Sequence, residues 1–337
     1  MLSGKFPLED QVILITGGSQ GLGKQFAYKY FHETKRTKVI VVSRSDAKLK
    51  PVVEEIEAGE DIDDEGVCLH HDTLNEDVIN KRRIFYLATD LSDFNAVDDM
   101  FNTLIKFKLC PTVILNCVGG STPKLFKDLT SHEIELGINQ NYKSVVTLTH
   151  SFLQKYDQLA QFSSDYKCHV VLFSSEVSFF PFIGYGQYAP LKVAMKALIS
   201  ILRQEILAPE FKDKVTLSCV YPGNFKSEGY ELEELTKPAI TKIIEGPSFP
   251  ISCDECCNKI IYWLDKGYND VTTDAVGWLL MAVDMGLNKN NNNSFLYWLQ
   301  LLIGVLANLI IVPIYMIICK WQINSYFSAA NKDKKED

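Results

Sequence analysis

The chain has 337 residues, of which 47% are apolar and 23% are charged, and its formal net charge is −8. This composition excludes a disordered chain and a collagen-like fibre, and the length is enough for one or two domains with a large core. The acidic balance argues against a nucleic-acid partner, because few counterions would be released from a phosphate backbone. The nine cysteines form no regular framework, which indicates a reducing compartment with free thiols.

Short apolar runs alternate with amphipathic segments over most of the chain. The runs predict strands at 12–16, 39–43, 85–89, 113–116, 170–174 and 216–221. The segments between them predict helices at 24–33, 47–57, 94–107, 131–156 and 188–207. This alternation predicts an α/β fold built on a doubly wound, parallel, Rossmann-type sheet.

A glycine-rich turn, TGGSQGLG at 16–23, follows the first predicted strand. Glycine is needed where the backbone turns sharply and lies against a pyrophosphate, and the helix that follows offers free N–H groups to the phosphates. Between a strand and a helix, this spacing predicts a dinucleotide site. The residues expected to contact the cofactor there are Gly17, Ser19, Gln20, Gly21 and Gly23.

The end of the second strand indicates which dinucleotide is bound. An NAD site usually carries an acidic residue there, whereas this chain has Arg44, with Lys48 one helical turn further. A guanidinium group can pair with a 2′-phosphate, so the sequence predicts NADPH. The ends of later strands are expected to add Asp90, Leu91, Asn116 and Gly119 to the cofactor site, although an ordinary capping role for Asp90 stays open.

A candidate catalytic group lies around the fifth strand. Tyr188 and Lys192 are four residues apart and share one helix face, and Ser175 lies 13 residues before Tyr188, at the end of the strand. An ammonium beside a phenol lowers the phenol's pKa, so Tyr188 is expected to exchange a proton near neutral pH. A second Tyr-x3-Lys pair, Tyr262 and Lys266, has no comparable strand or serine and is interpreted as a surface pair.

These residues together resemble the short-chain dehydrogenase/reductase family, over roughly residues 8–270. The resemblance rests on TGGSQGLG, on NCVG at 116–119, where the family usually has Asn-Asn-Ala-Gly, and on Ser175 with Tyr188-x3-Lys192. It implies that Asn141 completes a catalytic tetrad by joining Lys192 to a water relay, although a core asparagine that kinks a helix is the alternative. It also implies that Tyr188 and Lys192 contact the cofactor, with Lys192 holding the ribose. The loop after the sixth strand is expected to hold the nicotinamide, through Pro222, Gly223, Phe225 and Ser227.

The resemblance sets the expected domain limits. Residues 1–270 are expected to form the NADP-binding catalytic domain, with a substrate cover at 228–250. Residues 59–83, rich in Asp and Glu, are interpreted as a solvated insertion. A homodimer through the helices that carry Asn141 and Tyr188 is expected from the resemblance alone.

An apolar membrane-associated region is expected at 271–319, before a charged tail at 320–337. Residues 295–319 carry no charge, and as a helix they would reach about 37 Å, more than the roughly 30 Å hydrocarbon core of a bilayer. Trp298 and Trp321 lie near the ends of this segment, where interfacial rings are common. The segment is predicted to be a single span or a hairpin.

Charge predicts on which side of the membrane the tail lies. Lysines follow the apolar segment at 320, 332, 334 and 335, whereas Lys289 precedes it, which favours a cytosolic tail. A re-entrant hairpin, bent near Asn308 or Pro313 or using 277–287 as a partial first arm, would keep the catalytic domain in the cytosol as well. The last residues, KKED, resemble a dilysine retrieval signal, so an endoplasmic-reticulum membrane is the expected location.

The expected substrate comes from resemblance within the family. The apolar wall at 179–183, the runs GYGQYAPLK and YPGNFKSEGY and the membrane segment are similar to fungal reductases of long-chain sphingoid ketones. This implies NADPH-dependent reduction of a 3-keto group on a lipid taken from the membrane. The alternatives are a membrane-bound reductase of a steroid, a retinoid or a 3-ketoacyl lipid, and a non-catalytic nucleotide-binding scaffold. No metal site is predicted, because the Cys253-x2-Cys256 pair lacks the four ligands that zinc needs.

Overall fold

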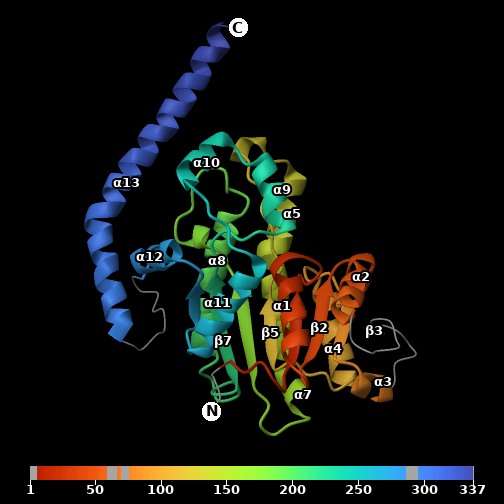
Figure 1. The fold of residues 1–337 in the computed structure, drawn as a ribbon. Helices are drawn as coiled ribbons and strands as arrows, with labels where there is room; N and C mark the ends of the chain where they lie inside the picture. The colour runs from red at the N-terminus through yellow and green to blue at the C-terminus, as the bar shows by residue number, and fades with distance from the viewer. Residues whose placement is uncertain (1–5, 59–66, 70–75, 286–294, 337) are drawn as a thin grey trace.

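The predicted parallel sheet is present and carries helices on both faces (Figure 1). The computed structural model describes residues 6–58, 67–69, 76–285 and 295–336. The strands lie in the order β3-β4-β2-β1-β5-β6-β7-β8 and all pair in parallel. Their bounds are β1 Val12–Thr16, β2 Lys38–Ser43, β3 Val67–Cys68, β4 Ile84–Ala88, β5 Val113–Asn116, β6 Cys168–Phe173, β7 Val215–Tyr221 and β8 Asp270–Thr272. The α/β fold expected from the alternation is therefore confirmed.

Two short strands were not predicted, and one of them corrects the interpretation of the acidic insertion. β3 and the helix α3 (Glu76–Lys81) both lie within 59–83, and Leu69 and Ile79 from the same segment are buried in the core. The segment is therefore not solvated throughout, because its few apolar residues extend the sheet and its packing. Residues 59–66 and 70–75 lie outside the described part of the chain. The other unpredicted strand, β8, runs past the expected domain limit at 270.

The helices bury an apolar face on each side of the sheet. On one side the core packs α1 (Gly21–Glu33), α2 (Asp46–Glu57) and α11 (Cys253–Asp265). On the other it packs α4 (Phe94–Lys106), α6 (Ser144–Gln154), α7 (Tyr156–Ala160) and α8 (Ala189–Glu205). Strands that are buried on both faces explain why runs such as VILIT have no polar alternation.

The helix expected over 131–156 is divided. α5 (Ser131–Ile138) ends in a five-residue π-helical segment, Asn139–Lys143, which leads into α6. Single π-helical turns occur often at functional sites, because the wider turn displaces a side chain and frees a carbonyl. This segment carries Asn141.

The cover predicted at 228–250 contains two helices. They are α9 (Glu228–Thr236) and α10 (Ala239–Glu245), and Lys237 lies between them. Ser227 caps α9, since its hydroxyl accepts a hydrogen bond from the Tyr230 N–H at 3.2 Å.

The apolar C-terminal region differs from both hairpin predictions. α13 (Phe295–Glu336) is one helix through Asn308 and Pro313, and although it bends along its length it does not turn back on itself as a hairpin would (Figure 1). The amide of Gln300 donates to the Trp278 carbonyl at 3.3 Å, and that of Asn308 donates to Val283 at 2.9 Å. Both contacts join α13 to α12 (Ala275–Val283), and the residue numbers rise together in the two helices, from Trp278 to Val283 and from Gln300 to Asn308. The two helices therefore run in the same direction and do not form an antiparallel hairpin.

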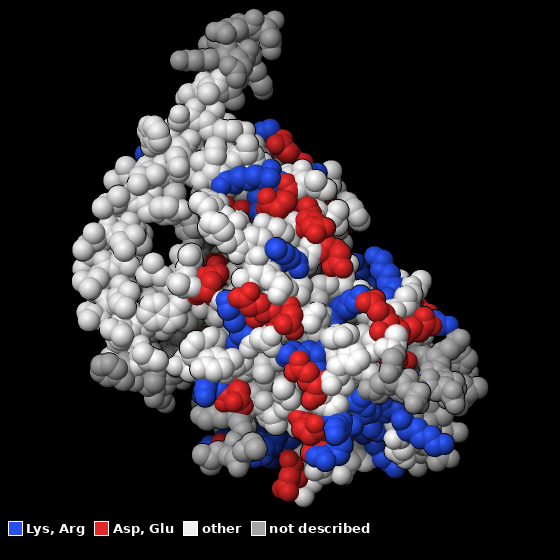
Figure 2. All heavy atoms as spheres, viewed as in Figure 1, with Lys and Arg blue, Asp and Glu red and all other residues white. Residues whose placement is uncertain are grey.

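α13 runs beside α12 and α10, and its C-terminal end extends beyond them (Figure 1). Many of its apolar side chains are exposed. Its Cys319 packs against Ile240 and Ile244 of α10, and the Tyr315 hydroxyl donates to the Ile244 carbonyl at 3.0 Å. Figure 2 shows this helix as almost free of charge, whereas Lys, Arg, Asp and Glu are spread over the rest of the visible face. Leu296–Ala329 is long and apolar enough to cross a membrane, and Trp298 and Trp321 are each 67% exposed.

Candidate active site

The candidate residues meet at one edge of the sheet because parallel strands end there together. Thr16 at the end of β1 pairs in register with Asn116 at the end of β5. The strand order reverses between these two strands, which is where ligands bind in open α/β sheets. Gly17, Gly119 and Ser175 follow β1, β5 and β6, and so the three loops converge on one crevice.

The glycine-rich turn has the backbone geometry that its sequence predicts. Gly17 and Gly21 have φ angles of +67° and +55°. This left-handed backbone conformation is strained for any residue that carries a Cβ, so glycine is favoured at both positions. A Cβ on Gly23 would lie 2.5 Å from the Gly17 carbonyl oxygen. α1 begins at Gly21, earlier than predicted, because the glycines form its first turn.

The N-terminus of α1 already binds an anion. Its N-cap residue Gln20 makes no side-chain capping bond, and the Gly21 N–H donates to a carboxylate oxygen of Glu228 at 3.2 Å. The carboxylate occupies the position in which the free backbone N–H groups at the start of α1 would hold a phosphate. Ser227 and Glu228 also line a crevice of about 490 Å³ beside Gly21 and Lys24.

Two buried polar groups near the expected cofactor lack partners. The Asn116 amide nitrogen and the Ser43 hydroxyl make no hydrogen bond with any residue the structure describes. The Thr16 hydroxyl holds Asn116 by donating to its amide oxygen at 2.8 Å. Arg44 and Lys48 are exposed just beyond Ser43. These features, with the glycine turn, fit a bound dinucleotide.

Asp90 and Leu91 lie beyond β4. Leu91 is buried, and the Asp90 carboxylate accepts from the backbone N–H of Ser92 at 2.9 Å and from its hydroxyl at 2.8 Å. Asp90 therefore makes the local turn bond that was the alternative, while the N-cap of α4 is Asp93. The turn leaves Asp90 exposed at the cofactor edge.

Ser175, Tyr188 and Lys192 come together as predicted. The Ser175 hydroxyl is hydrogen-bonded to the Tyr188 phenol, and the Lys192 Nζ lies 5.4 Å from the centre of the Tyr188 ring. Nζ also donates to the Phe173 carbonyl at 2.8 Å. The hydroxyl of neighbouring Ser174 is buried and donates to the Lys192 carbonyl at 3.0 Å, so Ser174 holds α8 and leaves Ser175 to face the phenol.

The pKa of Tyr188 differs from the sequence expectation. Burial raises the pKa of the phenol, Glu233 raises it further, and the Ser175 hydroxyl lowers it. Burial also lowers the pKa of the Lys192 ammonium, to about 8. The expected lowering by Lys192 is not found, because desolvation of the phenolate outweighs an ammonium that lies over the ring and is bonded to Phe173. Tyr188 is therefore held protonated at neutral pH.

Asn141 joins the catalytic loops through its amide. Its nitrogen donates to the carbonyls of Gly120 and Gly137, at 2.8 and 3.1 Å, and its oxygen accepts from the Gly120 N–H at 3.1 Å. A Cβ on Gly119 would lie 3.0 Å from this amide oxygen and 3.2 Å from the Lys192 Nζ. Asn141, Gly119 and Lys192 therefore pack closely.

The loop after β7 closes the site. The Gly223 N–H donates to the Thr273 hydroxyl at 3.0 Å, and Phe225 forms a β-bridge with Ile251. Pro222 is buried at the start of this loop. A Cβ on Gly21 would contact Ser227 at 3.4 Å, so this loop and the glycine turn face each other.

Three residues at the site were not predicted from the sequence. Glu233 of α9 accepts hydrogen bonds from the hydroxyls of Ser121, just after β5, and Tyr185. The Tyr185 ring lies 6.1 Å from the ring of Tyr188. The acidic cover is thus tied to the catalytic loops.

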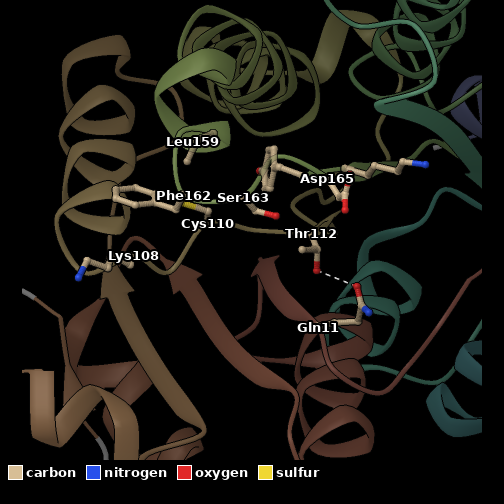
Figure 3. Close-up of a pocket in the computed structure, with 10 residues that line it drawn as sticks. Gln11, Lys108, Cys110, Thr112, Leu159, Phe162, Ser163 and Asp165 are labelled. Carbon is tan, nitrogen blue, oxygen red and sulfur yellow. Dashed lines mark hydrogen bonds between the residues drawn. The ribbon is translucent and has the colours of Figure 1, made fainter.

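Other motifs and hollows lie away from this edge. The second tyrosine–lysine pair is on the surface of α11, where Tyr262 is 53% exposed. A pocket of about 400 Å³ lies at the opposite edge of the sheet, beside the amino ends of β1 and β5 (Figure 3). There the Thr112 hydroxyl donates to Gln11, and no predicted site residue lines the pocket. Within the described ranges, no three His, Cys, Asp or Glu side chains gather as metal ligands.

A half-buried acid, Glu176, follows Ser175 directly. Burial and the neighbouring Asp274 raise the pKa of Glu176 to about 8. One carboxylate oxygen of Glu176 has no partner among the described residues and lies against Gly277, where an added Cβ would be 2.0 Å away. Glu176 is therefore protonated at neutral pH and joins α12 to the catalytic loop.

We expect Glu176→Gln to stabilise the protein at alkaline pH. Because the folded-state pKa is raised, folding of the wild type takes up a proton between about pH 4.5 and 8, so its stability falls across this window and is level above it. The glutamine variant lacks this fall and should gain roughly 1–3 kcal/mol at pH 9 relative to pH 4. Thermal unfolding midpoints at both pH values measure the difference. Glu231→Gln, on the exposed surface of α9, is the control, and parallel pH profiles for Glu176→Gln and wild type would contradict the expectation.

The chain matches known proteins over almost its whole length. The family model described as short chain dehydrogenase matches residues 11–79 and 69–234. A protein from Candida glabrata named 3-ketodihydrosphingosine reductase is 46% identical, covering 98% of this chain and 99% of the relative. Its namesake from Saccharomyces cerevisiae is 45% identical, covering 96% and 97%.

Solved structures show the same fold at lower identity. A short chain dehydrogenase from Burkholderia cenocepacia in complex with NADP has a TM-score of 0.58 and 18% identity, covering 79% of this chain and 97% of its own. A 3-ketoacyl-(acyl-carrier-protein) reductase from Brucella melitensis complexed with NADH has a TM-score of 0.59 at 18% identity, with the same coverage. With the family model and the curated relatives, these results place the chain in the short-chain dehydrogenase family.

Proposed function

We propose that the protein reduces the 3-keto group of 3-ketodihydrosphingosine to the alcohol of dihydrosphingosine, with NADPH as cofactor. The observation that carries this proposal is the 45–46% identity, over 96% or more of the chain, to proteins named 3-ketodihydrosphingosine reductase. Ser175, Tyr188, Lys192 and Asn141 at one edge of the sheet supply groups for the reaction, which disfavours a non-catalytic scaffold.

The chemistry of ketone reduction assigns a role to each residue. The bound nicotinamide would supply the hydride. The Ser175 hydroxyl donates a hydrogen bond to the carbonyl oxygen and stabilises charge as it develops there. Tyr188 gives its proton to that oxygen, and its raised pKa keeps the proton in place beforehand. Lys192 stabilises the phenolate that results, and Asn141 positions the loops next to Lys192.

We infer NADPH rather than NADH from the end of β2. The guanidinium of Arg44 is exposed and makes no ion pair with any residue in the described ranges, so it is available to a 2′-phosphate. Lys48, one turn into α2, would add a second cation.

Arg44→Glu should reverse the cofactor preference. An acidic side chain repels the 2′-phosphate and accepts from the ribose 2′-hydroxyl, so we expect the ratio of kcat/KM for NADPH over NADH to fall by at least about tenfold. Steady-state rates with each cofactor measure the ratio. Lys35→Glu, exposed just before the other end of β2, changes the net charge equally and should leave the ratio unchanged. An unchanged ratio in Arg44→Glu would refute the role of this residue.

A row of aromatic rings supports a substrate with a long alkyl chain. From Tyr188 the ring centres step to Tyr185 at 6.1 Å, Phe182 at 5.1 Å, Phe180 at 5.5 Å and Tyr315 of α13 at 5.5 Å. The row joins the catalytic phenol to the apolar helix. An alkyl chain laid along these rings would leave the site toward lipid, which a short or water-soluble ketone would not need.

The membrane location and the oligomeric state are also proposals. We place the catalytic domain and the tail together in the cytosol at the endoplasmic-reticulum membrane, because α13 is bonded to both α12 and α10 along the domain. Protease added to sealed microsomes should then remove a C-terminal epitope, and protection of the epitope would contradict this arrangement. A homodimer through the helices of Asn141 and Tyr188 stays part of the proposal.

Turnover of purified full-length protein in detergent tests the function. We expect NADPH oxidation that depends on 3-ketodihydrosphingosine and gives dihydrosphingosine, and much lower kcat/KM for steroid, retinoid and 3-ketoacyl ketones. Equal or better turnover of one of those ketones would replace the proposed substrate.

A further inference from the structure

The carboxylate of Glu233 lies beside the candidate catalytic residues, because it accepts from Tyr185, whose ring lies 6.1 Å from that of Tyr188, although Glu233 belongs to the cover. It accepts from the hydroxyl of Ser121, which is 112 residues away in sequence, and from that of Tyr185, which is 48 residues away. Ser121 follows the loop that Asn141 holds, and Tyr185 is in the loop before Tyr188. Two walls of the site therefore hold this one carboxylate, and its side chain is only 17% exposed.

The charge of Glu233 reaches the reacting group. Glu233 acts electrostatically on the Tyr188 phenol and disfavours the phenolate. For ketone reduction, in which Tyr188 must become a phenolate, such a carboxylate is a cost unless a cation comes to lie beside it. Lys237 supplies part of that compensation, and a positive group on the ligand would complete it.

Among the described residues, the lysines that pair with Glu233 and its neighbours in the cover are fewer than the carboxylates. Lys237, with its side chain fully buried, lies 3.2 Å from Glu233 and 2.7 Å from Glu245 and also contacts Glu234, which Lys242 reaches at 3.2 Å. Three carboxylates thus share two ammonium groups. A carboxylate accepts about four hydrogen bonds, so Ser121, Tyr185 and Lys237 leave Glu233 able to accept another.

The proposed substrate carries the matching cation. In 3-ketodihydrosphingosine a primary amine is attached to carbon 2, directly next to the keto carbon. When Ser175 and Tyr188 hold the keto oxygen, the ammonium must lie within a few ångströms of them. A buried ammonium is costly unless a carboxylate pairs with it. The acid at Glu176 does not suit this role, since its carboxylate lies against Gly277.

We propose that Glu233 binds the 2-ammonium group of the substrate and thereby selects amino ketones over ketones that lack the amine. This inference rests on the proposed function. Glu233 fixes the polar end of the molecule beside Ser121 and Tyr185, and the ring row then receives the alkyl chain from the other side of the keto carbon. Glu233 is thus a specificity-determining residue. Once the substrate ammonium is bound, its positive charge offsets the effect of Glu233 on the Tyr188 phenolate.

The test compares two ketones of equal chain length, 3-ketodihydrosphingosine and 1-hydroxyoctadecan-3-one, which lacks the amine. Wild type should favour the amino ketone in kcat/KM by at least about tenfold, since a hydrogen bond to a charged partner is lost with the other ketone. Glu233→Gln should lower this ratio at least about tenfold, mainly because kcat/KM for the amino ketone falls. The variant should still convert 1-hydroxyoctadecan-3-one to its alcohol. Glu234→Gln, which loses a contact to the same lysine outside the site, should keep the wild-type ratio.

The outcomes separate the inference from the proposed function. If wild type favours the amino ketone and Glu233→Gln keeps that preference, the inference is wrong and the function stands. If wild type treats both ketones alike, the inference is also wrong, whether or not the variant folds. If wild type oxidises NADPH with neither ketone, the proposed function fails and the inference fails with it.

Discussion

Tyr188→Phe is expected to lower kcat for ketone reduction by at least about 100-fold, because it removes the group that protonates the forming alkoxide. The phenol is buried and bonded to Ser175, and its raised pKa keeps the proton on the oxygen until the reaction needs it. Loss of one oxygen leaves the ring row and the packing of Tyr188 intact, so NADPH binding should change little. Steady-state kinetics and quenching of protein fluorescence by NADPH measure the two effects separately.

The second tyrosine–lysine pair provides the matched control for this variant. Tyr262 is on the exposed surface of α11 with Lys266 over its ring, so Tyr262→Phe should have the wild-type kcat. A Tyr188→Phe protein that reduces the ketone at the wild-type rate would remove Tyr188 as the acid. The same sequence spacing then gives two opposite expectations, and only the structural setting distinguishes them.

Gly23→Ala is expected to abolish cofactor binding. The added methyl group would lie 2.5 Å from the Gly17 carbonyl oxygen and 3.0 Å from the Gly18 Cα, and both of these atoms are backbone that cannot move without opening the turn. The glycine turn would then no longer approach the pyrophosphate, and we expect Kd for NADPH to rise by at least about 100-fold. Isothermal titration with NADPH measures this loss.

Gly229→Ala is the control for that change. Gly229 is exposed in α9, and an added methyl group meets only the Ser227 hydroxyl oxygen, at 3.8 Å. Because alanine favours a helix over glycine, this variant should bind NADPH as wild type does and be slightly more stable. If Gly23→Ala bound NADPH with the wild-type Kd, the glycine turn would not be the pyrophosphate site.

The sequence predicted the strands that are buried on both faces, because a run such as VILIT in β1 has one interpretation once glycines follow it. It missed β8, which is only three residues long and has no apolar run. It also joined α5 and α6 into one helix, since hydrophobic spacing does not reveal a π-helical turn at Asn141. The charges of 59–83 hid Leu69 and Ile79, which the core buries.

The candidate site was predictable where one motif carries one role, as for Ser175, Tyr188 and Lys192. Glu233 was not, because its place depends on how the cover folds back onto Ser121 and Tyr185, which are far away in sequence. The acidic run around it, EGYELEEL, was the available signal. The pKa of Tyr188 was predicted in the wrong direction, since spacing shows that an ammonium is near but not that burial outweighs it.

The most direct test of the account is the fate of the hydride. Wild-type protein, solubilised in detergent, is given 3-ketodihydrosphingosine and NADPH that is deuterated at carbon 4 of the nicotinamide. Two separate experiments use NADPH labelled on one face of the ring or on the other. One of the two labels should appear in dihydrosphingosine as a single deuterium on carbon 3, found by mass spectrometry of the product. Product that carries no deuterium from either label, or no product at all, would contradict the account.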